Sequence, residues 1–383
     1  MEQQSRKDCV KYNFPPIDLL KNGQLKNINE EKIRETAIKI KKILLSFGIR
    51  VQISDIRVGS RFTRYEIIPA MGVRIREIVR LENDIKMATA ATDIHIEAPI
   101  YGKKAIGIDL ENKENSIVTI REIVESREFA EIPSDIPIVL GCDIGGDILV
   151  EDMVKMLHLL IGGATGSGKT VFVNSLIMGI LYKASPDVVK MIMIDTKGIS
   201  LAVYNGIPHL LTNVLTDASE ALTALEWVVT EINNRYKCFA NCRVRDIKEY
   251  NTISGESYKM PTILVVIDDL SDLMALYKKE AERLIVRIVQ MSRNVGISLV
   301  VATQRPSIDV VTGLIKANIP SRIAFSVISA VDSRVILDEK GAELLLGNGD
   351  MLFKMQSCMS PIRIQAAYVS NKEINDVVNF IKI

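Results

Sequence analysis

Cysteine and histidine are scarce in this chain of 383 residues, which holds five cysteines and three histidines. The cysteines are Cys9, Cys142, Cys238, Cys242 and Cys358. So few and so scattered, they exclude the disulfide framework of a small secreted protein. Cys238 and Cys242 lie one helical turn apart, but no histidine has the spacing that would complete a metal site with them. We therefore interpret the cysteines as reduced packing residues.

A charge excess and long apolar runs are missing as well. The chain has 48 basic and 47 acidic residues, for a formal net charge of +1. Without a global basic field, a polyanion would have to bind a local patch or a surface built by several subunits. No apolar run approaches the roughly 18 to 20 residues that span a bilayer, and residues 1–16 lack the apolar core of a signal peptide. We expect a cytoplasmic protein that does not insert into a membrane.

The spacing of apolar residues predicts a lead-in followed by a small domain. Residues 1–30 contain a proline pair followed by turn residues, so we expect an extended lead-in there. Residues 31–147 combine helical spacing at 31–47 and 72–91 with short segments that alternate between apolar and polar residues. This mixture predicts a small mixed α/β domain that ends at a loop-rich boundary.

The remainder of the chain, residues 148–383, has a different rhythm. Short runs that are almost entirely apolar alternate with long helical patterns at 217–244 and 278–295. The apolar runs are HLLIGG, KMIMID, PTILVVIDD, ISLVVATQ and SRIAFSV. Buried parallel strands that are separated by crossover helices have this signature, so we predict a doubly wound α/β domain.

The segment GGATGSGKT, residues 162–170, fits the phosphate-binding pattern G-x-x-x-x-G-K-[ST] in full. An apolar run precedes it and a helical pattern follows it, which is the strand–loop–helix context that a P-loop needs. Backbone N–H groups of the loop would surround phosphate oxygens. The loop residues are Gly163, Ala164, Thr165, Gly166, Ser167 and Gly168. Lys169 would reach the β- and γ-phosphates and the Thr170 hydroxyl would bind Mg²⁺, so the expected cofactors are ATP and Mg²⁺.

Two acidic residues close the apolar run ILVVIDD. A P-loop enzyme needs an acid at the end of a second strand to hold magnesium through water, and Asp268 stands at that position. The carboxylate of Asp269 would orient and polarise the attacking water. The alternative for both is a solvated acid at a strand end.

Two further polar residues stand where phosphate chemistry could use them. Gln304 follows the strand pattern SLVVAT, from which its amide could sense a γ-phosphate. Arg293 lies at the end of the preceding helical pattern. There it would either interact favourably with the helix C-terminus or enter a neighbouring subunit's nucleotide site as an arginine finger.

Longer motifs resemble the motor of the FtsK/SpoIIIE family of DNA translocases. They include GGATGSGKT, MIMIDTKGISLAVYNGIPHLL, VATQRPSIDVVTGLIKANIPSRIAF, RVGSRFTRYEIIPAMGVRIREI and LGCDIGGD, and the resemblance covers residues 12–383. It implies a small α domain before a RecA-like ATPase domain, and a hexameric ring that pumps double-stranded DNA by ATP hydrolysis. It also implies that Asp268 binds magnesium, that Arg293 is the finger and that Gln304 is the sensor.

A segment that the resemblance places near the DNA pore is basic. Residues 305–322 carry Arg305, Lys316 and Arg322 against Asp309 alone, which indicates a DNA-binding patch in the pore. An ordinary solvated surface is the alternative for each of the three residues.

The chain also departs from the family. The family usually has glutamate where this chain has Asp269, so the presumed catalytic carboxylate is one methylene short. Neither the membrane-spanning region nor the DNA-reading winged-helix module of the family is present, which fits a motor fragment or a minimal motor carried by a mobile element.

Three functions therefore stand as hypotheses. The first is a DNA translocase in chromosome segregation or mobile-element transfer. The second is a protein-secretion ATPase of the same fold. The third is an assembly module that binds ATP and DNA and hydrolyses ATP only weakly, and the Asp269 substitution motivates it.

Overall fold

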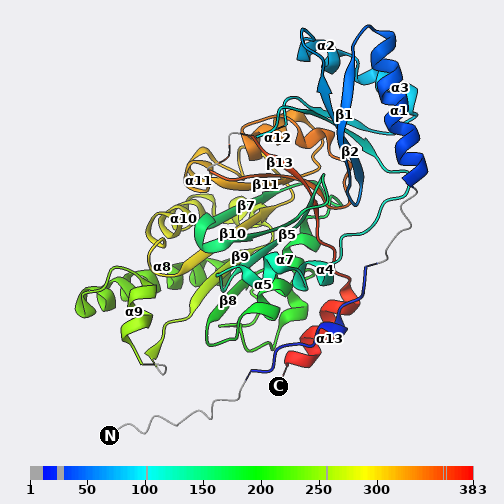
Figure 1. Cartoon of the computed structure of the whole chain (residues 1–383). Helices are drawn as coiled ribbons and strands as arrows, with labels where there is room; N and C mark the ends of the chain where they lie inside the picture. The colour runs from blue at the N-terminus through cyan, green and yellow to red at the C-terminus, as the bar shows by residue number, and fades with distance from the viewer. Residues whose placement is uncertain are drawn as a thin grey trace, which may run out of the picture.

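The structure, a computed structural model, describes residues 12–23, 30–100, 102–255, 258–356, 358 and 360–382. Two β-sheets organise this part of the chain, one of four strands and one of nine. The four-stranded sheet stands apart from the larger one with helices along its side (Figure 1). This division confirms the expected small α/β domain beside a larger α/β domain.

The small domain is an antiparallel sheet in the order β1-β2-β4-β3. Its elements are α1 (Glu30–Ser46), β1 (Val51–Val58), β2 (Phe62–Pro69), α2 (Ile75–Arg80), α3 (Glu82–Thr89), β3 (Ile94–Glu97) and β4 (Ile106–Glu111). The single helix expected at 72–91 was wrong, because the chain forms two helices that meet at Leu81, whose backbone leaves the helical region. Ile78 and Ile85, on either side of the break, are both fully buried in the core of this domain.

The large sheet has the order β6-β5-β13-β12-β11-β7-β10-β9-β8. Its strands are β5 (Pro137–Asp143), β6 (Ile148–Asp152), β7 (His158–Gly162), β8 (Val189–Ile194), β9 (Thr262–Ile267), β10 (Ile297–Thr303), β11 (Ser321–Phe325), β12 (Asp350–Lys354) and β13 (Ile362–Ala366). The five strands expected from the apolar runs, β11, β7, β10, β9 and β8, are parallel neighbours. The other four strands extend the sheet by antiparallel pairing.

The boundary between the two domains differs from the one that the sequence suggested. A division after residue 147 falls inside the hairpin of β5 and β6, and both strands belong to the nine-stranded sheet. Sheet membership therefore favours a boundary in the segment 112–136. That segment contains α4 (Ile120–Val124) and α5 (Arg127–Glu131), whose buried residues join the core of the large domain.

Helices cover both sides of the large sheet and enclose two apolar cores. The other helices of this domain are α6 (Met153–Met156), α7 (Lys169–Lys183), α8 (Ala218–Cys242), α9 (Ile247–Ile253), α10 (Leu270–Met291), α11 (Gly313–Asn318), α12 (Ala330–Leu337) and α13 (Asn371–Ile381). Side chains of α4, α7 and α13 form one core with the sheet, and side chains of α8 and α10 form the other. In none of the described ranges is there a helix long and apolar enough to span a bilayer.

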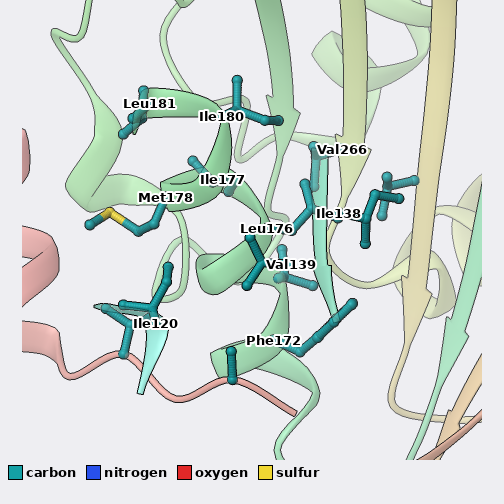
Figure 2. Close-up of a cluster of buried hydrophobic side chains, with 14 of the residues drawn as sticks. Ile120, Ile138, Val139, Phe172, Leu176, Ile177, Met178, Ile180, Leu181 and Val266 are labelled. Atoms are coloured by element: carbon teal, nitrogen blue, oxygen red, sulfur yellow. The ribbon is translucent and has the colours of Figure 1, made fainter. Parts of the chain in front are cut away.

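Helix α7, which follows the P-loop, is buried along most of its length. Figure 2 shows Phe172, Leu176 and Ile177 of α7 gathered with Ile138 and Val139 of β5. Gly179 permits this close approach, because a Cβ atom at that position would lie 2.6 Å from Cγ2 of Val139. The core thus fixes the helix whose first turn borders the P-loop.

Helices α8 and α10 correspond to the two long helical patterns. Helix α10 begins at Leu270 and not at residue 278, where the regular pattern starts. The backbone of Tyr277 explains the difference, because its φ of −136° and ψ of 46° interrupt the regular helix there. Helix α10 therefore begins directly after the two acids that follow β9, and Asp269 is its N-cap.

The described part of the lead-in, residues 12–23, lies on the large domain and not on the small one. Its trace runs beside α13 in Figure 1. The Tyr12 hydroxyl donates to the Leu181 carbonyl over 3.1 Å, and the Glu373 carboxylate accepts from the Lys21 amide over 2.8 Å. The rest of the expected lead-in, and Cys9 with it, lies outside the described residues.

Candidate functional site

The P-loop joins β7 to α7 at the carboxyl edge of the parallel strands. Gly166 and Gly168 have φ values of +80° and +112°, and a Cβ atom on Gly168 would lie 2.6 Å from the Gly349 nitrogen. Glycine is therefore required at Gly168 for both conformation and space.

The amides of the loop divide into two groups. Those of Gly163, Ala164 and Ser167 donate to the carbonyls of Thr303, Ser326 and Ala164 respectively. Those of Thr165, Gly166 and Gly168 make no hydrogen bond within the described residues. We infer that the first group holds the loop in shape and that the second group is available to an anion, a division that the pattern of glycines did not reveal.

A cavity of about 620 Å³ opens over the second group. Its volume lies within the range of about 300 to 1,000 Å³ that is usual for small-ligand sites. The P-loop with the start of α7, the connection between the two domains and the end of β13 form much of its lining. The β1–β2 turn, the residue after β10 and the loop before β12 complete it. The lining residues are Arg61, Asn115–Val118, Ala164–Gly166, Gly168–Val171, Gln304, Asn348, Gly349 and Gln365–Tyr368.

Lys169 and Asp268 form a buried ion pair beside this cavity. The Lys169 ammonium donates to the Asp268 carboxylate over 3.0 Å and to the Asp268 carbonyl over 2.8 Å. Both side chains are at most 3% exposed. A nucleotide that recruits Lys169 to its phosphates must break this pair, which would release the carboxylate for a cation.

Asp269 is turned away from the cavity and its two oxygens are occupied. Oδ1 accepts from the amide and the hydroxyl of Ser271 over 3.1 and 2.8 Å, which caps α10, and from the Thr303 hydroxyl over 3.4 Å. Oδ2 accepts from the Lys197 ammonium over 2.7 Å. Burial acts to raise the pKa of Asp269, but the hydrogen bonds from Lys197 and Ser271 prevail and lower it. The carboxylate is thus ionised and engaged at the position where the sequence predicted a water-orienting base.

Gln304 follows β10 and lines the cavity, as its place in the sequence predicted. Its side-chain oxygen accepts from the Thr165 hydroxyl over 3.1 Å. The amide is thereby linked to the P-loop tip, where a γ-phosphate sensor would have to stand.

Arg293 lies at the other end of β10. The strand runs from Ile297 to Thr303, about 20 Å at ~3.3 Å per residue, and separates the Arg293 turn from Gln304. The Arg293 side chain is exposed and makes no hydrogen bond or ion pair within the part of the chain that the structure describes. It cannot reach the cavity of its own chain, which agrees with the alternative of a finger that acts on another subunit.

The residue before Arg293 is anchored by a buried histidine. The Ser292 hydroxyl and His158 Nε2 are 3.1 Å apart, and His158 Nδ1 accepts from the Leu299 amide over 3.1 Å. Burial lowers the His158 pKa to about 4, so the ring is neutral at physiological pH.

The three cations suggested as a DNA-binding patch have different environments. Arg305 is exposed. Lys316 pairs with Asp338 over 2.6 Å, and the guanidinium of Arg322 pairs with the same carboxylate and donates to backbone carbonyls. Arg322 is only 9% exposed. Its charge is therefore used within the fold. Of the three, Arg305 alone is both exposed and unpaired within the ranges that the structure describes.

The site also contains residues that the sequence patterns did not single out. Arg61, in the β1–β2 turn of the small domain, reaches the large domain and donates to the Gly347 carbonyl over 2.8 Å. Gly349, two residues on, donates its amide to the Ser167 carbonyl over 2.9 Å. The small domain is thus connected to the P-loop through one short loop. The density of arginines over residues 57–80 was the only signal in the sequence, and it pointed to no particular residue.

With this geometry established, comparison with known proteins is informative. A family described as FtsK/SpoIIIE matches residues 119–308, and a domain described as the FtsK alpha domain matches residues 14–112. A DNA translocase FtsK from Caldanaerobacter subterraneus is 50% identical over 380 residues, which cover 98% of this chain and 53% of that protein. One from Clostridium acetobutylicum is 47% identical over 384 residues, which cover 99% of this chain and 50% of that protein. The chain spans about half the length of these curated relatives.

Solved structures share the fold at lower identity. The pCW3 conjugation coupling protein TcpA, in its monomer form with ATPγS, has a TM-score of 0.63 at 22% identity over 90% of this chain and 99% of that chain. The cytoplasmic domain of the Type VII secretion ATPase EccC from Thermomonospora curvata has a TM-score of 0.60 at 22% identity over 70% of this chain and 34% of that chain. These likenesses show that the chain shares the fold of these two structures.

Proposed function

Because this chain belongs to the FtsK/SpoIIIE family, we propose that it is an ATP-driven motor that moves double-stranded DNA through a ring of identical subunits. The observation that carries the proposal is the cavity over the P-loop, which Lys169, Thr170 and Gln304 line together. DNA movement during chromosome segregation or transfer of a mobile element is the work that such a motor performs. The relatives named DNA translocase FtsK support this choice of substrate.

ATP is the nucleotide that we assign to the cavity. The amides of Thr165, Gly166 and Gly168 would bind phosphate oxygens, and Lys169 would exchange its pairing with Asp268 for the β- and γ-phosphates. Mg²⁺ would neutralise the charge that develops on the phosphates, held by the Thr170 hydroxyl and, through water, by Asp268. Mg²⁺ usually keeps several of its bound waters, so that only one or two protein side chains need to hold it.

The position of Arg293 supports the ring in this proposal. An exposed arginine about one strand length from its own cavity can complete a nucleotide site only in another copy of the chain. A ring also suits the near-neutral net charge, because only the segments that line its pore need to be basic. A hexamer is the arrangement we expect.

The test is the rate of ATP hydrolysis with and without long duplex DNA, on protein whose ring formation has been checked by electron microscopy. We expect DNA to raise the rate and Lys169→Ala to reduce it to background, because the phosphate charge loses its partner. Turnover that survives Lys169→Ala would end the P-loop assignment. Turnover that depends on Lys169 but responds to a secretion-signal peptide and not to DNA would indicate a protein-secretion ATPase.

A specific observation favours a second candidate, an assembly module that binds ATP and DNA with little turnover. Both oxygens of Asp269 are engaged, and its side chain is shorter than the glutamate usual in the family. Under this hypothesis the protein binds ATP and forms rings, but its rate of hydrolysis stays near the Lys169→Ala background with saturating DNA. The same experiment therefore separates the two functions.

A further inference from the structure

The loop after β8 reaches the presumed catalytic carboxylate from the neighbouring strand. Lys197 Nζ lies 2.7 Å from Asp269 Oδ2. The Lys197 side chain is 41% exposed, whereas that of Asp269 is 3% exposed. One partner of the pair is therefore at the surface on a flexible stem, and the other is fixed inside as the cap of α10.

The backbone around Lys197 is held rigidly by a buried acid. Oδ1 of Asp195 accepts from the amides of Lys197 and Gly198 over 3.2 and 3.1 Å. Oδ2 accepts from the amides of Ser200 and Leu201 over 2.7 and 3.0 Å. Asp195 is 2% exposed. Four hydrogen bonds to one carboxylate fix the loop, so that the ammonium group of Lys197 can move while its backbone stays in place.

The same loop makes a second contact with the first turn of α10. The Thr196 hydroxyl donates to Asp272 over 2.8 Å. Neighbouring residues of the loop thus bind two acids of one helix turn. This arrangement holds the carboxylate of Asp269 against the β8 loop and away from the cavity, which Asp269 does not line.

A carboxylate that orients an attacking water needs an oxygen free to accept from that water. Ser271 occupies Oδ1 of Asp269, and loss of that contact would uncap α10. Lys197 alone occupies Oδ2 among the described contacts, and it can leave by rotation of its exposed stem. Oδ2 is therefore the oxygen that can be released at the smaller structural cost.

We propose that Lys197 is a positioning residue that holds Asp269 in a resting orientation, and that ATP hydrolysis requires Lys197 to release Oδ2. The proposal rests on the ATPase function proposed above. It implies that the ion pair restrains hydrolysis in the absence of DNA and has little influence on nucleotide binding, because neither residue lines the cavity.

The experiment compares Lys197→Met, which keeps the stem and removes the charge, with Lys197→Arg, which keeps the charge. Without DNA, Lys197→Met should raise kcat by about 5-fold, the scale of one lost coupled contact, and leave KM and nucleotide affinity unchanged. The ratio of the rates with and without DNA should fall. Lys197→Arg should behave like the wild type. A lower kcat in Lys197→Met would overturn the proposal, because it would make Lys197 a support of catalysis and not a restraint.

A double variant tests whether Lys197 acts through Asp269. Lys197→Met combined with Asp269→Asn should be as slow as Asp269→Asn alone, and an effect of Lys197→Met that persists in that background would contradict the proposal. Lys197→Gln serves as a second neutral variant, with Tm measured for each protein, so that an unstable Lys197→Met does not decide the result. Suppose that the wild type hydrolyses ATP faster than Lys169→Ala but that neither neutral variant is faster than the wild type. The proposed restraint by Lys197 is then wrong, and the proposed ATPase function is unaffected. If all of these proteins stay at the Lys169→Ala background, the ATPase function fails and the restraint with it.

Discussion

The two edges of the parallel sheet are built differently. At the carboxyl edge, the P-loop, Asp268 and Gln304 converge on one cavity, and their polar groups are linked by hydrogen bonds. At the opposite edge, Arg293 stands in an exposed turn whose neighbour Ser292 contacts the buried His158. One edge is organised around a small ligand, whereas the other presents a cation that has no hydrogen-bond or ion-pair partner among the described residues.

This difference indicates that each chain carries two halves of different sites. The carboxyl edge carries the residues proposed to bind and position the nucleotide, and two of its lysines are already paired, Lys169 with Asp268 and Lys197 with Asp269. We propose that the amino edge supplies Arg293 to the site of another copy. A ring in which one edge meets the next subunit's other edge would bring these halves together, and substitutions at each edge test the two halves separately.

The largest effect is expected at the amino edge. Arg293→Ala should reduce turnover by about 10³- to 10⁵-fold, the usual value of a trans arginine, while ATP binding at the distant cavity is retained. Arg287→Ala, at an exposed arginine of the preceding helix α10, is the matched control and should hydrolyse ATP normally. Full activity of Arg293→Ala would remove the finger from the mechanism.

Rings that contain a mixture of two mutant subunits, one altered at each edge, sharpen this test. Arg293→Ala and Lys169→Ala subunits are each expected to be inactive alone. Mixed rings should regain part of the ATPase rate, because some interfaces then contain an intact Lys169 and an intact Arg293. Absence of recovery despite demonstrated subunit exchange would argue for action within one chain or for strict coupling around the ring.

The next effect is expected at Asp269. Asp269→Asn should lower turnover by about 10²-fold or more, as loss of a general base does. Asparagine also caps helices well, so thermal stability should change little. Asp269→Glu should hold or raise the rate. An Asn variant with the wild-type rate would assign the water-orienting role to another residue.

The sequence predicted the carboxyl edge well because its signals are local. Each parallel strand is a continuous apolar run, and the P-loop, Asp268 and Gln304 each follow such a run directly, so their common edge could be inferred from chain direction alone. The role of Asp269 was harder to predict, since its partner Lys197 is 72 residues away in the loop after β8. Local pattern fixes which edge a residue occupies, but it does not reveal which contacts already satisfy its side chain.

The same limit applies to the part of the cavity lining that lies outside the P-loop, and to the domain boundary. Arg61 and residues 115–118 and 365–368 come together only through the packing of the two domains. Strands β5 and β6 resembled the end of the small domain because they follow it in sequence, yet β5 pairs with β13, more than 200 residues later. Pairing at that separation leaves no periodic signal in the chain.

Arg61→Ala tests whether the small domain supports nucleotide binding. Loss of its charged hydrogen bond to the Gly347 carbonyl should loosen the loop that holds Ser167, and nucleotide affinity should fall by about 10-fold. Titration with fluorescent ATP would measure this change. Arg76→Ala, an exposed arginine of the same domain, is the control. Unchanged affinity would confine the site to the large domain.

The smallest effect is expected for DNA contact. Arg305 is exposed and unpaired in the part of the chain that the structure describes, so Arg305→Ala should weaken binding to duplexes of any sequence equally. The slope of log K against log salt should fall by about 1 for each phosphate contact that is lost. Arg322→Ala should instead lower Tm, because it removes one of the two cations that pair with Asp338 and several hydrogen bonds to backbone carbonyls. If Arg322→Ala lowers the salt slope at unchanged Tm, Arg322 leaves its internal partners to bind DNA, and the patch extends beyond Arg305.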